Sequence, residues 1–431
     1  MKTARLTELR LTCFKSFRDA VVPLDGMTVL TGKNSSGKSN VLDALDVLSR
    51  LATPERLRDS LDGRHREGGP VRGGSGGLAP HGESSFTLGC TVRVNGAAGA
   101  VDYLYDVEVE VEEEPRVVAE TINLRGGDQQ DSTPLLTALS GDDEEELTVA
   151  IGPLPAFKIP RSFTMLSFFP RGVETISDDP RSAEAVDIVL RTLRNAVILN
   201  ADVSSMKDYV SQGRREIEPD MANLSALVRL MKSELPSLFG RLEALSREVA
   251  GCPIEALDFI TADDGREVML ALRESGTART GSRSMSDGLL RFIAIATALL
   301  LFPQSAQEEP DDDGRTPAAR VVAIEEVENG LHPSHAARLL ELVEEAGAQA
   351  GISVIITTHS PALLDAIGGR HAEDVLVCHD GQVTRLPDLP GYDRAMARGT
   401  LGRVVSQGLL TGPSEDDGAD YSDFLRLVGA M

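Results

Sequence analysis

The sequence contains no tryptophan, few other aromatic residues and only four cysteines. Cys13, Cys90, Cys252 and Cys378 are widely spaced and form no C-x-x-C pair, which predicts reduced thiols rather than a disulfide framework or a zinc site. The longest largely apolar stretch, Phe292–Phe302, is well short of the roughly 20 residues that a membrane-spanning helix needs. The N-terminal segment is charged throughout and has no apolar signal core. We therefore expect a cytoplasmic protein that does not cross a membrane.

Basic side chains are also scarce, since the 431 residues carry 43 Lys and Arg against 67 Asp and Glu, a formal net charge of −24. Twenty of the acidic residues lie in four runs without Lys or Arg, and the remaining chain is nearly neutral, with 47 acidic and 43 basic side chains. We expect these runs to be solvated loops or turns. They are Asp106–Glu114, Asp142–Glu146, Glu308–Asp313 and Glu415–Asp420.

A cluster of arginines is the best local candidate for a nucleic-acid contact, although the composition shows no basic domain. The alternative, which the pattern favours, is a set of helix-surface arginines that runs into a loop. The cluster consists of Arg50, Arg56, Arg58, Arg64, Arg66 and Arg72.

The N-terminal half is predicted to be rich in strands. Residues 5–31 indicate two strands, a turn and a third, buried strand, and a helix follows from Ser39. Residues 86–124 alternate with period two, as in an antiparallel sheet with one face in water. The polar stretch 126–146 is expected to interrupt that sheet.

The C-terminal half is predicted to contain helices first and then alternating helices and strands. Within the helical segment 180–249, Pro236 separates two short helices, so no long coiled-coil arm is expected. A hairpin is predicted around Asp263–Gly265. The alternation after it indicates a sheet with helices packed on it. It comprises helices from 288, at 333–348 and from 361, and strands at 321–324, 354–357 and 375–378.

The segment Gly32–Ser39 matches G-x-x-x-x-G-K-S and lies between a predicted buried strand and an amphipathic helix. Its glycines let backbone N–H groups surround a phosphate, and the helix N-terminus adds partial positive charge. Lys38 would reach the β- and γ-phosphates and Ser39 would bind Mg²⁺. The segment therefore predicts a nucleoside-triphosphate site. Its residues are Gly32, Lys33, Asn34, Ser35, Ser36, Gly37, Lys38 and Ser39.

A second chemical element is the strand 321–324, which ends in Glu325 and Glu326 and is expected beside the P-loop strand. Glu325 could hold the Mg²⁺ shell, and Glu326 could orient or deprotonate water. Taken alone, two acids at a strand end are usually a solvated turn. The segments 327–333 and 357–361, which follow in order, make the pattern more specific.

Together with Ser284–Arg291, these landmarks resemble the RecF-like and OLD-like ABC-type ATPases, a group that includes the SMC proteins and is often labelled as AAA-type. Leu11–Phe17, and Asn40 after the P-loop, are similar to the start of these ATPases as well. The resemblance spans about residues 6–378. It implies an α/β P-loop NTPase of ABC/RecF type, with an antiparallel β subdomain and a helical lobe.

The resemblance also implies that two heads close face to face over two ATP molecules with Mg²⁺. Ser286 and Gly288, at a helix start, would then cap the γ-phosphate that the partner subunit's Lys38 holds. His359 would contact the γ-phosphate, and Glu328–Leu331 would meet the partner. A Ser-x-Gly at a helix start is a second anion site. Two phosphate-binding sites in one chain make sense if they meet around a shared ligand.

Three features depart from the family pattern. Glu325 stands where the family usually has Asp, so we expect slow hydrolysis. The signature reads Met-Ser-Asp-Gly instead of Leu-Ser-Gly-Gly, and Asp287 adds a charge near a phosphate. The glutamine that senses Mg²⁺ in many relatives is not identified. Phe168–Gly172 lies about where its loop is expected, and Arg171 is either a nucleotide contact or a surface arginine.

The predicted organisation is a composite ATPase head over residues 1–390 and a C-terminal tail over 391–431. The head divides into a P-loop half at 1–52, a β subdomain at 85–175, a helical insertion at 177–250 and a signature and Walker B half at 251–390.

The predicted function is ATP hydrolysis by a head that dimerises around Mg·ATP, in DNA repair or genome maintenance, with DNA binding implied by the resemblance alone. The alternative is an anti-phage defence ATPase that switches a separate nuclease or toxin, because only about 50 residues follow Cys378. A transporter subunit is disfavoured, since Lys38 and Ser286 are 248 positions apart.

Overall fold

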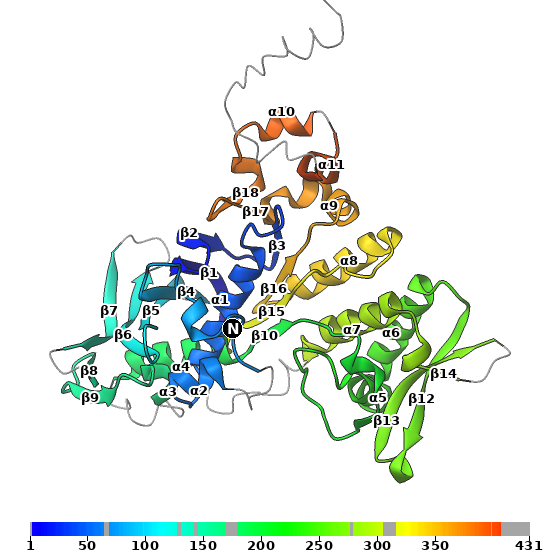
Figure 1. Cartoon of the computed structure of the whole chain (residues 1–431), viewed down its shortest axis with the longest axis horizontal. Helices are drawn as coiled ribbons and strands as arrows, with labels where there is room; N and C mark the ends of the chain where they lie inside the picture. Colours follow the sequence, from blue (N-terminus) through cyan, green and yellow to red (C-terminus); the bar gives the residue numbers. More distant parts are fainter. Residues whose placement is uncertain are drawn as a thin grey trace, which may run out of the picture.

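The computed structural model describes residues 2–63, 69–97, 99–126, 131–141, 145–168, 179–275, 279–304, 316–397 and 399–406. Over these residues the chain forms an eight-stranded sheet, a central six-stranded sheet and a smaller sheet in a separate lobe (Figure 1). No helix in these ranges has the length and apolar character required to span a membrane.

The eight-stranded sheet is antiparallel throughout, in the order β2-β1-β4-β5-β6-β7-β8-β9. Alternate side chains face its core, as the period-two pattern predicted for residues 86–124. The strands are β1 (Thr3–Phe14), β2 (Phe17–Pro23), β4 (Ser85–Gly96), β5 (Gly99–Glu110), β6 (Arg116–Gly126), β7 (Ser132–Ser140), β8 (Glu146–Ile151) and β9 (Phe157–Pro160).

Two sequence-based expectations about this sheet were wrong. The polar stretch 126–146 does not interrupt it, because β7 pairs with β6 and β8 and buries Leu136 and Ala138. The acidic run 106–114 is not all loop, since its first half belongs to β5. The valines that alternate with the acids are buried there and hold the backbone in the sheet.

The central sheet has the order β10-β15-β16-β3-β17-β18, and all its strands are parallel except β18. Its strands are β10 (Ala196–Leu199), β15 (Arg320–Ile324), β16 (Ile352–Thr357), β3 (Met27–Thr31), β17 (Val375–His379) and β18 (Gln382–Arg385). Both faces are buried: Val321 and Ala323 belong to one hydrophobic core and Val322 and Ile324 to the other. The first core is shared with the eight-stranded sheet.

Helices cover both faces of the central sheet. The core shared with the eight-stranded sheet also contains α1 (Lys38–Leu51) and α4 (Pro180–Arg194), while α8 (Ala336–Gly347) and α9 (Pro361–Ile367) belong to the other, which continues through α7 (Asp287–Leu301) into the lobe. Four shorter helices are also present among the described residues: α2 (Leu57–Asp62), α3 (Met165–Phe168), α10 (Tyr392–Met396) and α11 (Leu401–Ser406).

The separate lobe contains α5 (Leu224–Glu234), α6 (Pro236–Val249) and α7 with the small sheet (Figure 1). That sheet consists of β11 (Val210–Ser211), β12 (Ile254–Ala262), β13 (Glu267–Glu274) and β14 (Thr280–Gly281). The two helices divided at Pro236 and the hairpin around Asp263–Gly265 are as the sequence predicted.

The predicted domain boundaries do not coincide with breaks between sheets. β1 and β2 pair into the same sheet as the β subdomain, and the segment predicted as a helical insertion contains β10, a strand of the central sheet. The start of the predicted tail is packed, since α11 contacts α9 and buries Leu401 and Val404. The division into domains remains a prediction.

Candidate nucleotide site

The P-loop follows β3 and ends at the first turn of α1, as the sequence predicted. At two of its glycines, Gly32 and Gly37, any other residue would strain the backbone and clash with its neighbours. Gly32 has φ of 141°, and a Cβ there would lie 2.4 Å from the carbonyl oxygen of Cys378. Gly37 has φ of 105°, and its Cβ would lie 2.7 Å from the ring of Phe17. The loop is therefore held closely between β17 and the turn after β1.

Lys38 is buried at the start of α1 and folds back over the loop. Its Nζ donates hydrogen bonds of 2.9 Å to the carbonyl oxygens of Gly32 and Lys33. Burial lowers the pKa of the Lys38 ammonium, and the nearby carboxylates of Glu326 and Glu328 offset part of that effect. The positive charge thus lies inside the loop, where a phosphate would compete with the two carbonyl groups for it.

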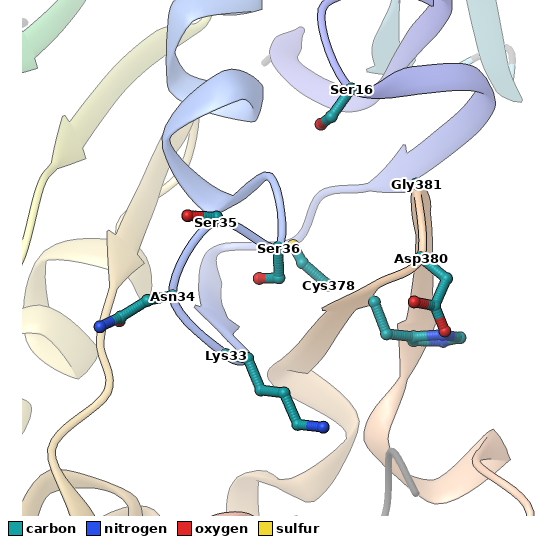
Figure 2. A pocket seen from close by; sticks show the side chains of 9 residues that line it. Ser16, Lys33, Asn34, Ser35, Ser36, Cys378, Asp380 and Gly381 are labelled. Carbon is teal, nitrogen blue, oxygen red and sulfur yellow. The ribbon is translucent and has the colours of Figure 1, made fainter. Parts of the chain in front are cut away.

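A pocket of about 240 Å³ lies beside the P-loop, between Ser16 and the turn that joins β17 to β18 (Figure 2). Ser36 lines it, and its buried Oγ has no hydrogen-bond partner among the described residues. Asn40 donates a 2.8 Å hydrogen bond to the Oγ of Ser16, which ties α1 to the other wall. The pocket is lined by Ser16, Lys33, Asn34, Ser35, Ser36, Cys378, His379, Asp380 and Gly381.

Ser39 and Glu325, the two residues predicted to hold Mg²⁺, lie close enough for the Ser39 hydroxyl to act on the Glu325 carboxyl group. Burial alone would raise the pKa of Glu325, but the hydrogen bonds from Arg72 and the nearby hydroxyl of Ser39 outweigh it, so the pKa of this carboxyl is lowered. One hydroxyl and one ionised carboxylate are the hard oxygen ligands that Mg²⁺ takes beside phosphate and water. The donor set therefore fits Mg²⁺.

The strand that carries these acids is not adjacent to the P-loop strand, contrary to expectation, because β16 lies between β15 and β3. The register still aligns their carboxyl ends, since Ile324 pairs with Ile356 and Ile356 pairs with Val29. The loop after β16 therefore enters the site between the P-loop, which follows β3, and the acidic turn, which follows β15.

Glu326 has φ of 45°, a left-handed conformation that is rare and costly for a side chain with a Cβ. Its N–H donates to the Oγ1 of Thr357 over 2.8 Å, and its carbonyl oxygen accepts from Arg291 over 3.4 Å. Contacts from two neighbouring elements thus hold the residue in this conformation. A conformation fixed at such a cost is typical of a functional position.

His359 is exposed, and its backbone N–H donates to the Oε1 of Glu328 over 2.9 Å. The other oxygen of Glu328 is buried and has no hydrogen-bond partner within the described residues. Glu328 thus links the loop after β16 to the turn after β15. The imidazole of His359 is left in solvent, where it can meet a ligand.

Ser286 and Gly288 lie at the start of α7. This helix belongs to the lobe (Figure 1). Ser286 is exposed and caps the helix by accepting a hydrogen bond from the N–H of Leu289. A Cβ on Gly288 would lie only 2.2 Å from the carbonyl oxygen of Gly330, so the helix start packs directly on the turn after β15. The additional charge of Asp287 is paired with Lys207 at 2.7 Å.

The structure brings most of the predicted residues together at one edge of the central sheet, and it leaves Ser286 accessible at the start of another helix. Their chemical roles stay predictions. Arg171 lies outside the described residues. Sequence reasoning missed two arginines, Arg72 and Arg291, which contact the side chain of Glu325 and its backbone carbonyl respectively. Of the arginine cluster, Arg72 thus belongs to the site, while Arg64 and Arg66 lie outside the described residues.

Two family models match the chain. One, described as "AAA domain, putative AbiEii toxin, Type IV TA system", matches residues 161–365, and another, described as "AAA ATPase domain", matches residues 5–67.

Curated relatives share shorter segments. The chain is 25% identical over 168 residues to the methionine import ATP-binding protein MetN of Clostridioides difficile (strain 630), a match that covers 37% of this chain and 46% of that protein. It is 42% identical over 55 residues to the DNA replication and repair protein RecF of Trichodesmium erythraeum (strain IMS101), a match that covers 12% of this chain and 14% of that protein. The chain thus spans less than half the length of these relatives.

Similar solved structures include an SMC head bound to the C-winged helix domain of ScpA, with a TM-score of 0.44 and 14% identity, covering 88% of this chain and 97% of that one. Another is the recombination mediator protein RecF with ATP, with a TM-score of 0.37 and 14% identity, covering 90% of this chain and 100% of that one. The two family models, both described as AAA domains, together match the P-loop segment and the segment with the signature and the acidic turn, and the chain is thus similar to AAA-type ATPases over both parts of the site.

Proposed function

We propose that the chain binds Mg·ATP at residues 32–40, hydrolyses it slowly, and dimerises around two nucleotides in DNA repair or genome maintenance. The observation that carries the proposal is the convergence of the P-loop with the acidic turn after β15. The Ser39 hydroxyl helps to lower the pKa of Glu325, and the charges of Glu326 and Glu328 act on Lys38. These residues come from two segments almost 300 positions apart in sequence.

In the proposed mechanism, the P-loop N–H groups and Lys38 bind the triphosphate, and Lys38 exchanges its two carbonyl partners for phosphate oxygens. Ser39 and Glu325 would hold Mg²⁺, which when bound neutralises charge on the phosphates. Glu326 accepts a proton from the attacking water, and its fixed backbone limits the positions that its carboxylate can take. His359 contributes a hydrogen bond to the γ-phosphate.

The proposed dimer places Ser286 and Gly288 of each copy against the nucleotide of the other. Its support is that Ser286 is exposed at the N-terminus of the fifteen-residue helix α7, where the helix dipole favours an anion. If Ser286 were packed inside the lobe, this arrangement would be impossible.

The test is light scattering after size exclusion, with and without Mg·ATP, combined with phosphate release. Glu326→Gln should bind ATP, lose about 10²- to 10⁴-fold in turnover and accumulate as a dimer. Glu114→Gln, which removes the same charge from an exposed ion pair with Arg58, is the control and should behave as wild type. Undiminished turnover in Glu326→Gln would rule out Glu326 as the base.

A second candidate function is an ATP-dependent switch for a separate nuclease or toxin effector. The description of the matched family, which names a toxin of a type IV system, favours it. The two candidates differ in DNA binding, which a repair ATPase should show with a steep salt dependence, because each neutralised phosphate releases counterions. Fluorescence anisotropy with duplex and single-stranded DNA, with and without ATP, separates them, and absence of binding to either supports the switch.

A further inference from the structure

Arg72 binds the carboxylate of Glu325 with both terminal nitrogens of its guanidinium group. Its Nη1 lies 3.1 Å from Oε1 of Glu325, and its Nη2 lies 2.7 Å from Oε2. Both carboxylate oxygens therefore accept a charge-assisted hydrogen bond, the arrangement in which an arginine pairs most strongly with an acid. Ser39, the other residue of the proposed metal site, lies close enough to act on the same carboxyl group.

The segment that carries Arg72 is attached to α1 independently of Glu325. Lys15 donates from Nζ to the backbone carbonyl of Arg72 over 2.9 Å and to Oδ2 of Asp43 over 2.6 Å. The side chains of Lys15 and Asp43 are only 11% and 12% exposed, which makes this a well-shielded anchor. The Arg72 side chain itself is 53% exposed, so it can rotate away while its backbone stays in place.

A metal ion and this guanidinium group would need the same oxygen atoms. Glu325 has only two carboxylate oxygens, and a cation beside Ser39 would bring its own positive charge close to that of Arg72. Repulsion between the two cations then adds to the competition for ligand atoms.

We propose that Arg72 is the counter-ion of Glu325 in the metal-free state and that Mg²⁺ must displace it, so that Arg72 sets the Mg²⁺ requirement of the site. The inference rests on the proposed binding of Mg·ATP at the P-loop and adds a built-in competitor to it. Arg72 acts as a positioning residue, since it holds Glu325 rather than the nucleotide.

The test compares ATP affinity in excess EDTA with ATP affinity in excess Mg²⁺, measured by displacement of a fluorescent ATP analogue. The ratio of the ATP affinity in Mg²⁺ to the ATP affinity in EDTA reports how favourably Mg²⁺ enters the site. Arg72→Ala should raise the ratio by roughly 2- to 10-fold, the range expected for loss of a partly exposed bidentate ion pair. Arg72→Lys keeps the charge but loses the bidentate geometry, so its ratio should lie between those of wild type and Arg72→Ala.

Controls separate this effect from a general loss of charge or of folding. Arg58→Ala removes an arginine from an ion pair with Glu114 and should leave the ratio unchanged. In a Glu325→Gln background, Arg72→Ala should change the ratio by less than about 2-fold, because the shared carboxylate is gone. Thermal unfolding of each variant verifies that it is folded.

An equal or smaller ratio in Arg72→Ala than in wild type overturns the inference while ATP binding itself stands. The inference is also overturned if Arg72→Ala changes the ratio equally in the wild-type and Glu325→Gln backgrounds, because the competition would then not involve that carboxylate. A wild-type protein that binds no nucleotide in either condition overturns the proposed function and this inference together.

Discussion

The contact between Gly288 and Gly330 provides a direct test of how the signature helix is positioned. An ideal Cβ at Gly288 would lie 2.2 Å from the carbonyl oxygen of Gly330 and 3.2 Å from its carbonyl carbon. Carbon–oxygen contacts under 3.0 Å essentially do not occur, so Gly288→Ala must move the helix start and the turn apart by nearly an ångström. Gly330 has φ of 75°, which limits how its backbone can adjust.

We expect Gly288→Ala to destabilise the protein by about 1–3 kcal/mol, the usual cost of adding a methyl group to a tightly packed contact. The displacement also moves Ser286, which lies two residues earlier. ATP-dependent dimerisation should therefore weaken, while nucleotide binding to the monomer, which uses the P-loop, should stay close to wild type.

Gly240 is the matched control, because it lies within α6 and a Cβ there meets nothing within 4 Å. Gly240→Ala should stabilise the protein by about 0.5–1 kcal/mol, because alanine is the better helix former. Urea unfolding measures both stabilities, and light scattering with Mg·ATP measures dimerisation. The reasoning fails if Gly288→Ala matches Gly240→Ala in stability and dimerises like wild type.

Two further predictions concern buried titratable groups. Burial raises the pKa of Glu120 from 4.5 to about 7, so the native state holds this proton more tightly than the unfolded state and loses stability as the pH rises between these values. Relative to Glu120→Gln, wild type should lose up to about 3 kcal/mol between pH 4.5 and 8 in urea titrations, and parallel pH profiles would contradict this. Burial also raises the pKa of the Cys90 and Cys378 thiols to about 12, so Ellman's reagent should modify the half-buried Cys13 and Cys252 first in native protein; four equal rates would refute the assignment.

The sequence was sufficient to locate the elements whose patterns are local. The P-loop, the helices divided at Pro236 and the hairpin around Asp263–Gly265 each depend on signals within a few residues, and all three lie where they were predicted. The alternating helices and strands after residue 320 were also correct, because each buried strand is a short apolar run between turn residues.

The strands that were missed had no distinctive period. β10 has four apolar residues and follows α4 after the single residue Asn195, so it cannot be told from a continuation of the helix. β7 contains Ser, Thr and Pro, and tertiary pairing with β6 and β8 decides its conformation. The pair of Arg72 and Glu325 joins residues 253 positions apart, and no local pattern encodes such a contact.

The place of β3 in the central sheet has a consequence for biosynthesis. Residues 27–30 pair with residues 354–357 on one side, and residues 29–31 pair with residues 375–377 on the other. Both neighbours of this strand therefore leave the ribosome more than 300 residues after it does. Such long-range pairing makes folding slow and leaves the early strands without their final partners during translation. A nascent chain should acquire ATP affinity only after His379 has emerged, however early its glycine-rich loop is made.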